Sequence, residues 1–223
     1  MRLVVFDLDG TLVNSGAHIG TTMSATFVEA GLPVPTPQDI AQIIGLSLEL
    51  AVARLGGLAG TEIDRVAAIY RRLYHQSIAS AGSEPLFEGV HEVLDRLSAE
   101  PGTLLGIATG KGLRGVRRII ELHGLGSRFV TIQTPDDNPS KPHPGMLDSA
   151  MRETGIAPER TVMVGDTSFD MEMARAAGCC ALGVTWGSHT PRILRTTGAQ
   201  AIVTRVGNLD AAINSLVKAE QDA

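Results

Sequence analysis

The stretch Leu3-Val4-Val5-Phe6-Asp7-Leu8-Asp9-Gly10-Thr11-Leu12-Val13 decides how the rest of the chain can fold. Its first four residues are apolar, which predicts a buried strand over 3–6. Two aspartates, a glycine and a threonine follow. Carboxylates at the end of a buried strand are costly to desolvate unless a cation or hydrogen bonds compensate. Folding does not require them there, so we expect them to serve a function.

Five further short apolar runs predict buried strands, and stretches with helical spacing lie between them. Alternating strands and helices favour parallel pairing with helices on both faces of the sheet. The sequence therefore predicts an α/β fold with a doubly wound, Rossmann-like parallel sheet. The further predicted strands cover 104–108, 129–132, 161–164, 180–184 and 201–203, and helices between them include 114–123, 146–154 and 170–177.

One interval, from about residue 16 to residue 83, contains no strand-like run. Helical patterns recur there instead, separated by prolines and glycines, which predicts an insert of about four helices after the first strand. We expect residues 1–15 and 84–223 to form an α/β core domain and residues 16–83 to form a separate helical domain. The predicted helices of the insert cover 19–30, 37–43, 48–55 and 61–81.

Composition narrows the possible partners and location of the protein. The net charge is −5, and no lysine-rich block is present, so we expect no nucleic-acid partner. No run approaches the ~18 apolar residues of a membrane span, and Asp7 interrupts the N-terminal apolar run too early for a signal peptide. We therefore expect a cytoplasmic protein without membrane contact. Cys179 and Cys180 lie in an apolar run and are expected to pack in the core.

The polar residues that follow the predicted strands are expected to lie together. In open parallel sheets, ligands bind beyond the carboxyl ends of the strands. Three acids near a hard cation suit Mg²⁺, and a carboxylate can attack phosphorus to give an aspartyl-phosphate. Lysine and hydroxyl groups would neutralise the charge of a transferring phosphoryl group. The residues that follow the strands are Asp7, Asp9 and Thr11, then Thr109, Gly110 and Lys111, then Lys141, and finally Asp166 and Asp170.

The order and type of these residues resemble the four sequence motifs of the haloacid dehalogenase superfamily. The helical insert between the first and second motifs is similar to the cap of its phosphoglycolate phosphatase-like branch. The resemblance implies that Asp7 is the nucleophile and Asp9 the acid and base. It also implies that Thr109 binds the phosphoryl group and that Lys141 neutralises its charge.

The same resemblance implies a Mg²⁺ site and a substrate site. The metal ligands would be Asp7, Asp166 and the main-chain carbonyl of Asp9, and Asp170 would orient Asp166 or a metal-bound water. The expected substrate-binding residues are Thr11, Thr109, Gly110 and Lys141.

The function implied by the resemblance is a Mg²⁺-dependent phosphatase that hydrolyses a small phosphorylated metabolite through an aspartyl-phosphate. The best single candidate for the substrate is 2-phosphoglycolate. Asp9 favours phosphoryl transfer over dehalogenation, because dehalogenases of the superfamily generally lack this second acid. Two alternatives stay open: a sugar-phosphate mutase of the β-phosphoglucomutase type, which usually has an aliphatic residue at the position of Thr11, and a non-catalytic binding or regulatory protein.

Several features of the sequence are left without a role. Lys111 is either a solvated residue at a helix start or part of the site. The cluster Arg114, Arg117 and Arg118 is either a solvated helix face or a substrate anchor, and Asn14 replaces an aspartate that is common in relatives. Residues 44–47 of the insert are expected to project into the substrate pocket. Both a monomer and a homodimer fit the sequence.

Overall fold

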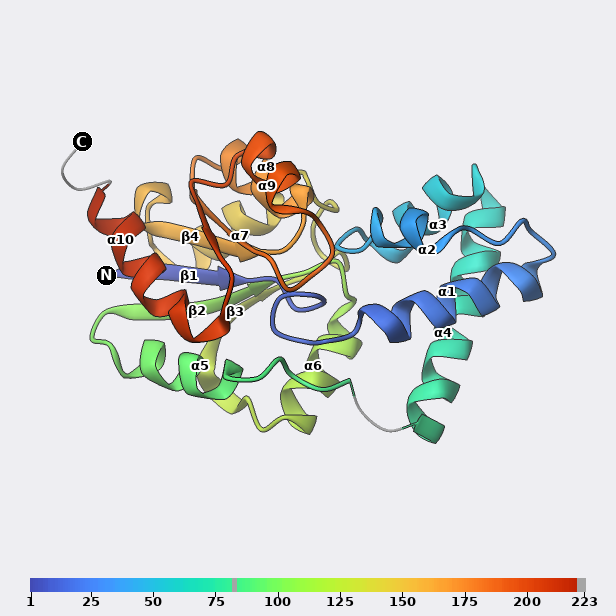
Figure 1. Cartoon of the computed structure of the whole chain (residues 1–223), viewed down its shortest axis with the longest axis horizontal. Helices are drawn as coiled ribbons and strands as arrows, with labels where there is room; N and C mark the ends of the chain where they lie inside the picture. The colour runs from blue at the N-terminus through green and yellow to red at the C-terminus, as the bar shows by residue number, and fades with distance from the viewer. Residues whose placement is uncertain (82–83, 220–223) are drawn as a thin grey trace.

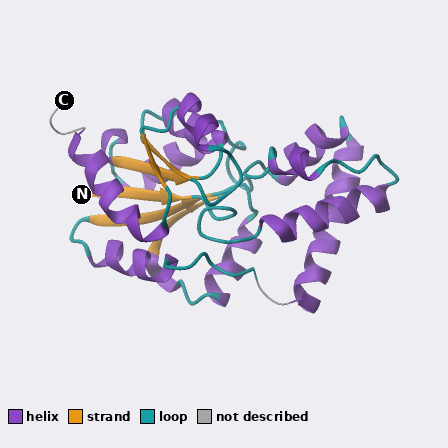
Figure 2. Ribbon diagram, in the orientation of Figure 1, coloured by secondary structure: helices purple, strands orange, loops and turns teal. Residues whose placement is uncertain are grey.

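The computed structural model describes residues 1–81 and 84–219 of the chain (Figure 1). Within these residues, six strands form one parallel sheet in the order β3-β2-β1-β4-β5-β6. Helices lie on both sides of this sheet (Figure 2), which confirms the predicted doubly wound α/β fold. The strands are β1 Arg2–Phe6, β2 Thr103–Ala108, β3 Phe129–Gln133, β4 Thr161–Gly165, β5 Cys180–Val184 and β6 Ala201–Val203.

Strand β1 lies inside the sheet and is covered on both faces. Its residues 3–6 are fully buried. Successive side chains of a strand point to opposite faces. Accordingly Val4 and Phe6 belong to one apolar cluster, whereas Leu3 and Val5 belong to another. Because both faces are core, the strand reads as a continuous apolar run rather than as an alternating pattern.

The helices of the core bury apolar stripes against the two faces. The predicted helices over 114–123, 146–154 and 170–177 correspond to α6, α7 and α8 within two residues. Helices α5, α9 and α10 add to those predicted. The first face is covered by α5 (Val90–Ala99), α6 (Leu113–Leu122) and α10 (Leu209–Ala219), and the second by α7 (Gly145–Thr154), α8 (Ser168–Ala176) and α9 (Pro191–Thr197). Single 3₁₀ turns cover Gly126–Arg128, Pro158–Arg160 and Val206–Asn208.

The first four of the helices between β1 and β2 lie to one side of the sheet in Figure 1, and they are called the cap below. They have an apolar cluster of their own, which Phe169 of α8 also joins. The predicted domain boundary at residues 83 and 84 falls where the described chain is interrupted, so the boundaries stay a prediction. The cap helices are α1 Gly16–Ala30, α2 Pro37–Ala41, α3 Leu48–Gly56 and α4 Thr61–Ala81.

The two connections between cap and core run side by side. Val13, on the way into the cap, forms an isolated antiparallel bridge with Leu86, on the way out. The Asn14 amide donates to the Pro85 carbonyl at 2.8 Å, and the Phe87 amide donates to the Leu12 carbonyl at 3.0 Å. A paired, two-stranded link of this kind fixes where the cap joins the sheet.

Two expectations from the sequence, on the cysteines and on membrane spans, can be compared with the structure. Cys179 and Cys180 are buried thiols, as expected for core packing. Burial raises the pKa of Cys179 to about 12. No helix in the described part of the chain is both long and apolar enough to pass through a membrane.

The cap cluster should contribute measurably to stability. Phe27 is fully buried in it, whereas its neighbour Val28 is 65% exposed. We expect Phe27→Ala to reduce the free energy of unfolding by about 3–5 kcal/mol, because it leaves a cavity. The matched control Val28→Ala should stay within about 0.5 kcal/mol of wild type. Urea unfolding measures both, and equal losses in the two variants would contradict the packing described.

Candidate active site

The predicted site residues follow neighbouring strands at the edge of the sheet that faces the cap (Figure 1). Since the strands are parallel, their carboxyl ends meet along this one edge. Asp7 and Asp9 follow β1, Thr109 and Gly110 follow β2, Lys141 lies in the loop after β3, and Asp166 and Asp170 follow β4. The sheet order β3-β2-β1-β4 thus brings residues from four separate parts of the sequence together.

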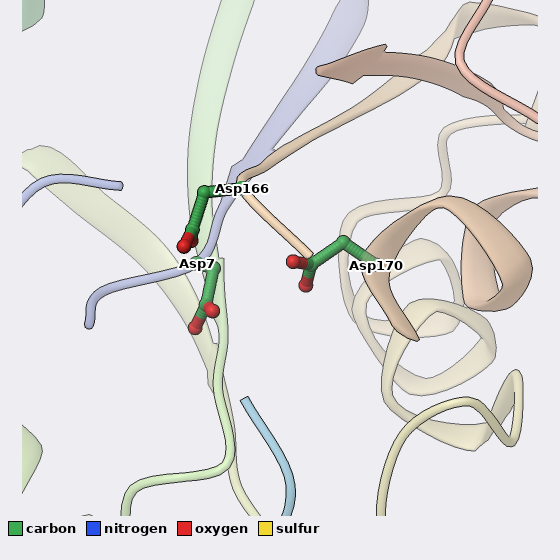
Figure 3. Close-up of side chains that lie close together, drawn as sticks. All are labelled: Asp7, Asp166 and Asp170. Atoms are coloured by element: carbon green, nitrogen blue, oxygen red, sulfur yellow. The ribbon is translucent and has the colours of Figure 1, made fainter. Parts of the chain in front are cut away.

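Lys141 is the link between two of the aspartates. Its Nζ lies 3.1 Å from Asp7 Oδ1 and 2.6 Å from Asp170 Oδ1, and all three side chains are at most 1% exposed. Figure 3 shows the side chains of Asp7, Asp166 and Asp170 close together, and carboxylate oxygens of the three lie within 4.8 Å of one another. A lysine so fully buried is stable only because it is paired.

The buried centre of the site consists of Asp7, Lys141, Asp166 and Asp170. Further hydrogen bonds orient each of its aspartates. Asp7 Oδ1 also accepts from the Leu8 amide at 2.7 Å. Asp166 accepts from the Thr11 hydroxyl at 2.8 Å and from the Ser188 amide at 2.7 Å. Asp170 Oδ2 accepts from the amide and hydroxyl of Thr167, which completes a capping box at the start of α8. The carboxylates are therefore held in fixed positions.

Two glycines let the backbone approach Asp166. Gly10 has a φ of +86°, and a Cβ at this position would lie 2.3 Å from Asp166 Oδ2. A Cβ at Gly187 would lie 2.2 Å from the same oxygen. Any other residue at either position would have to displace the carboxylate. The glycine after the two aspartates of the opening stretch is thus required by close approach as well as by its backbone conformation.

Burial is the main influence on the pKa values of the groups in the buried centre. It raises the pKa of Asp7 to about 8, against the pull of Lys141. It also raises the pKa of Asp166 to about 6, with a further rise from the charge of Asp170. Burial alone would lower the pKa of Lys141, but attraction to Asp170 and Asp7 raises it above its ordinary value. The lysine therefore stays charged. The carboxylates, in contrast, have too little positive charge around them to offset the cost of burial.

A cavity of about 500 Å³ adjoins the buried centre between cap and core. Asp9, Thr109 and Gly110 line it from the core. From the cap, residues 44–46 line it as predicted, whereas the Ser47 amide instead donates to the Ser140 hydroxyl of the core. The other walls are largely apolar or aromatic, including Ile19, Met23, Ile43, Leu48, Tyr70 and Tyr74, and the cationic residues Lys111, Arg71 and Arg114 also face it.

Gly110 is a direct contact between core and cap. A Cβ at this position would lie 2.4 Å from the carbonyl oxygen of Leu46 and 2.6 Å from that of Gly45. The cap loop therefore rests against the backbone that follows β2. This contact gives a physical reason for glycine after Thr109 in this chain.

The structure resolves part of what the sequence leaves open. Lys111 is not a solvated residue, because its side chain is only 11% exposed and its Nζ lies 3.2 Å from Asp9 Oδ2. Arg114 lines the cavity, whereas Arg117 is exposed on α6 and does not. Asn14 lines a second cavity, of about 590 Å³, on the side of Gly10 and Trp186.

The loop after β5 is the part of the site that the sequence analysis does not identify. Ser188 donates to Asp166, and the Trp186 indole donates to the Thr11 carbonyl at 3.0 Å. His189 Nδ1 accepts from the Ser168 amide at 2.9 Å, at the start of α8. The rule that ligand sites follow strand ends applies to this loop too, so its position after the fifth strand could have indicated it.

Fold and site together define an enzyme of the capped α/β class, and comparison with known proteins gives its family. The family model of haloacid dehalogenase-like hydrolases matches residues 4–184. The chain is 35% identical to the "Probable phosphatase IndB" of Dickeya dadantii (strain 3937) over 97% of this chain and 95% of that protein. It is 29% identical to a phosphoglycolate phosphatase of Haemophilus influenzae (strain 86-028NP), over 83% of this chain and 86% of that protein.

A solved hydrolase from Pseudomonas syringae has the same fold, with a TM-score of 0.86 at 22% identity over 96% of this chain and 99% of its own. The chain belongs to the haloacid dehalogenase-like hydrolase family. It is an enzyme of the phosphatase kind within that family, as the resemblance of its motifs implies.

The burial of Asp7 should make the cation-free protein less stable as pH rises. Unfolded Asp7 ionises near its ordinary pKa of about 3.9, whereas the folded pKa is about 8. Between these values the folded state binds a proton that the unfolded state has lost, so stability falls as pH increases through this window. We expect Asp7→Asn to melt at a higher temperature than wild type in chelator, by a larger margin at pH 8 than at pH 5.5.

The matched control for this measurement is Asp95→Asn, since the Asp95 side chain is 60% exposed and pairs with Arg128 at the surface. Its melting temperature should follow that of wild type at both pH values. A margin for Asp7→Asn that does not depend on pH would contradict a raised pKa at this carboxyl group.

Proposed function

We propose that the protein is a Mg²⁺-dependent phosphatase that hydrolyses a small phosphomonoester through an aspartyl-phosphate on Asp7. The observation that carries this proposal is the position of the Asp7 carboxylate. Its Oδ1 is fixed by Lys141 and the Leu8 amide. Its Oδ2 is buried and has no hydrogen-bond partner among the described residues. A buried carboxylate oxygen without a partner is costly unless a ligand uses it.

The residues of the site fit a divalent cation. Carboxylate oxygens are the ligands that Mg²⁺ prefers, and those of Asp7, Asp166 and Asp170 are close enough to share one ion. The acids also outnumber the lysines, since Asp7, Asp9, Asp166 and Asp170 are balanced only by Lys141 and Lys111 among their ion-pair partners. A divalent cation would restore the balance.

We assign the direct metal contacts to Asp7, Asp166 and the main-chain carbonyl of Asp9. Asp170 is paired with the ammonium group of Lys141 through one oxygen and accepts both donors of Thr167 with the other. Each oxygen of Asp166, by contrast, accepts a single bond from a neutral donor. Asp170 therefore fits the role of orienting the other ligands and Lys141. When bound, the cation would supply positive charge to the phosphoryl oxygens.

The remaining chemistry falls to side chains of the chain itself. An oxygen of Asp7 forms a bond to phosphorus as the bond from phosphorus to the ester oxygen breaks, and Asp9 gives its proton to that departing oxygen. Asp9 then takes a proton from water, which attacks phosphorus and frees Asp7. The phosphoryl group would be bound and neutralised by Lys141, together with Thr109, Gly110 and Thr11.

The walls of the cavity favour a substrate that carries a small organic group on its phosphate. Arg114 at the cavity wall would attract a carboxylate, whereas Arg71 is paired with Glu49. The apolar residues of the cavity would exclude water from the transfer. The phosphoglycolate phosphatase of Haemophilus influenzae is one of the similar proteins. On these grounds 2-phosphoglycolate remains the first candidate for the substrate.

Phosphate release tests the proposed reaction. With Mg²⁺, wild-type protein should release phosphate from at least one ester in a panel that includes 2-phosphoglycolate and sugar phosphates. Asp7→Asn should reduce kcat about a thousandfold or more, because the nucleophile is lost. The surface control Asp95→Asn should keep wild-type kcat. An active Asp7→Asn variant would exclude Asp7 as the nucleophile.

Thermal melting tests the metal without relying on turnover. Mg²⁺ and beryllium fluoride, a phosphoryl mimic, should together raise the melting temperature of wild type, because both bind only the folded protein. Neither alone should raise it as much, and Asp7→Asn should not respond to the pair. The same rise in the presence of a chelator would contradict a metal requirement.

A further inference from the structure

Lys111 occupies a buried position where core and cap meet. Its Nζ lies 3.2 Å from Asp9 Oδ2 and donates to the Tyr74 hydroxyl of α4 at 2.9 Å. The same nitrogen lies 4.9 Å from the centre of the Tyr74 ring and 3.9 Å from Glu84 Oε2. One ammonium group thus contacts an acid of the core, the longest cap helix and the connection that leaves the cap.

Glu84 and Tyr74 hold this ammonium group in place. The Tyr74 hydroxyl donates to Glu84 Oε2 at 2.6 Å, so a chain of donors runs from Lys111 through Tyr74 to Glu84. The Glu84 main-chain carbonyl lies 2.8 Å from His123 Nε2 of the core. Burial alone would lower the pKa of Lys111, but Asp9 and Glu84 raise it, so the group is a cation. The network is therefore satisfied only while α4 lies against the core.

The two oxygens of Asp9 have different surroundings. Oδ2 faces Lys111, whereas Oδ1 is buried and has no hydrogen-bond partner in the described part of the chain. Asp9 also lines the cavity. The ion pair with Lys111 thus restrains rotation of the carboxyl group and leaves one oxygen available to a ligand.

We propose that Lys111 is a positioning residue, which fixes Oδ2 of Asp9 so that Oδ1 exchanges the proton, and which is itself fixed by Tyr74 and Glu84 when the cap is in place. This inference rests on the proposed phosphatase activity. In the first step the proton leaves Asp9 Oδ1 for the ester oxygen, as the bond from that oxygen to phosphorus breaks and the bond from Asp7 forms. The charge of Lys111 stabilises the carboxylate that remains. Docking of the cap is thereby coupled to the geometry of the acid.

The test compares aryl phosphates whose leaving groups differ in their need for a proton. The leaving group of 4-nitrophenyl phosphate departs as a stable anion, whereas that of 4-methoxyphenyl phosphate needs general acid assistance. We expect Lys111→Met to lower kcat/KM for 4-methoxyphenyl phosphate by about 10- to 100-fold. This is only part of the factor of about 10²–10⁴ that general acid catalysis contributes, because Asp9 itself is still present. For 4-nitrophenyl phosphate the loss should be less than about threefold.

Two further variants sharpen this comparison. Tyr74→Phe keeps the aromatic ring but removes the hydroxyl, so it should change the ratio of the two substrates in the same direction by a smaller factor. Arg117→Met removes a cation from an exposed position of α6 and should leave the ratio unchanged. The ratio within one variant does not depend on how much of the protein is folded, so a partly unfolded variant remains informative.

Other outcomes would overturn the inference. Equal losses on both substrates would show a structural role for Lys111, and an increase in KM without a change in the ratio would show that it binds substrate instead. Wild-type protein that hydrolyses neither ester nor any member of the phosphomonoester panel would overturn the proposed function itself. Activity in wild type with an unchanged ratio in Lys111→Met and Tyr74→Phe would overturn only the role of Lys111.

Discussion

The burial of several carboxylates at one edge of the sheet is the constraint on which the rest of this structure depends. Asp7, Asp166 and Asp170 are at most 1% exposed, and ionised groups in such surroundings need compensating charge and hydrogen bonds. Lys141 supplies the charge within the chain. The hydroxyl of Thr11 and the amides of Leu8 and Ser188 supply the hydrogen bonds. The sheet, its glycines and the capping box of α8 all serve to hold these groups in place.

Core and cap contribute different parts of the site. The buried centre lies wholly on elements of the α/β core, which are rigid because both faces of the sheet are packed. The cavity wall comes from both parts. Contacts between them include the loop at Gly45 and Leu46 against Gly110, the Ser47 amide on Ser140, and Lys111 on Tyr74. Phe169 of α8 also packs in the apolar cluster of the cap. Changes on the cap wall of the cavity can therefore alter its shape without moving the buried centre.

The similarity to known hydrolases extends over both core and cap. The family model covers residues 4–184, and the similar fold at 22% identity shows that the architecture tolerates extensive change in sequence. A fold does not determine a substrate. In this chain the cavity combines apolar side chains with Arg71, Arg114 and a buried Lys111.

The sequence by itself determined the sheet, its strands and the residues at their carboxyl ends. Continuous apolar runs define buried strands, and parallel pairing then places Asp7, Lys141 and Asp166 along one edge whatever the details of packing. Only the tertiary structure decided the surroundings of Lys111, Glu84 and Ser188. Burial of a lysine or a glutamate between cap and core arises from how two separate parts of the chain dock, and no local pattern encodes that. For the same reason, the close approaches at Gly10, Gly110 and Gly187 became visible only once distant segments met.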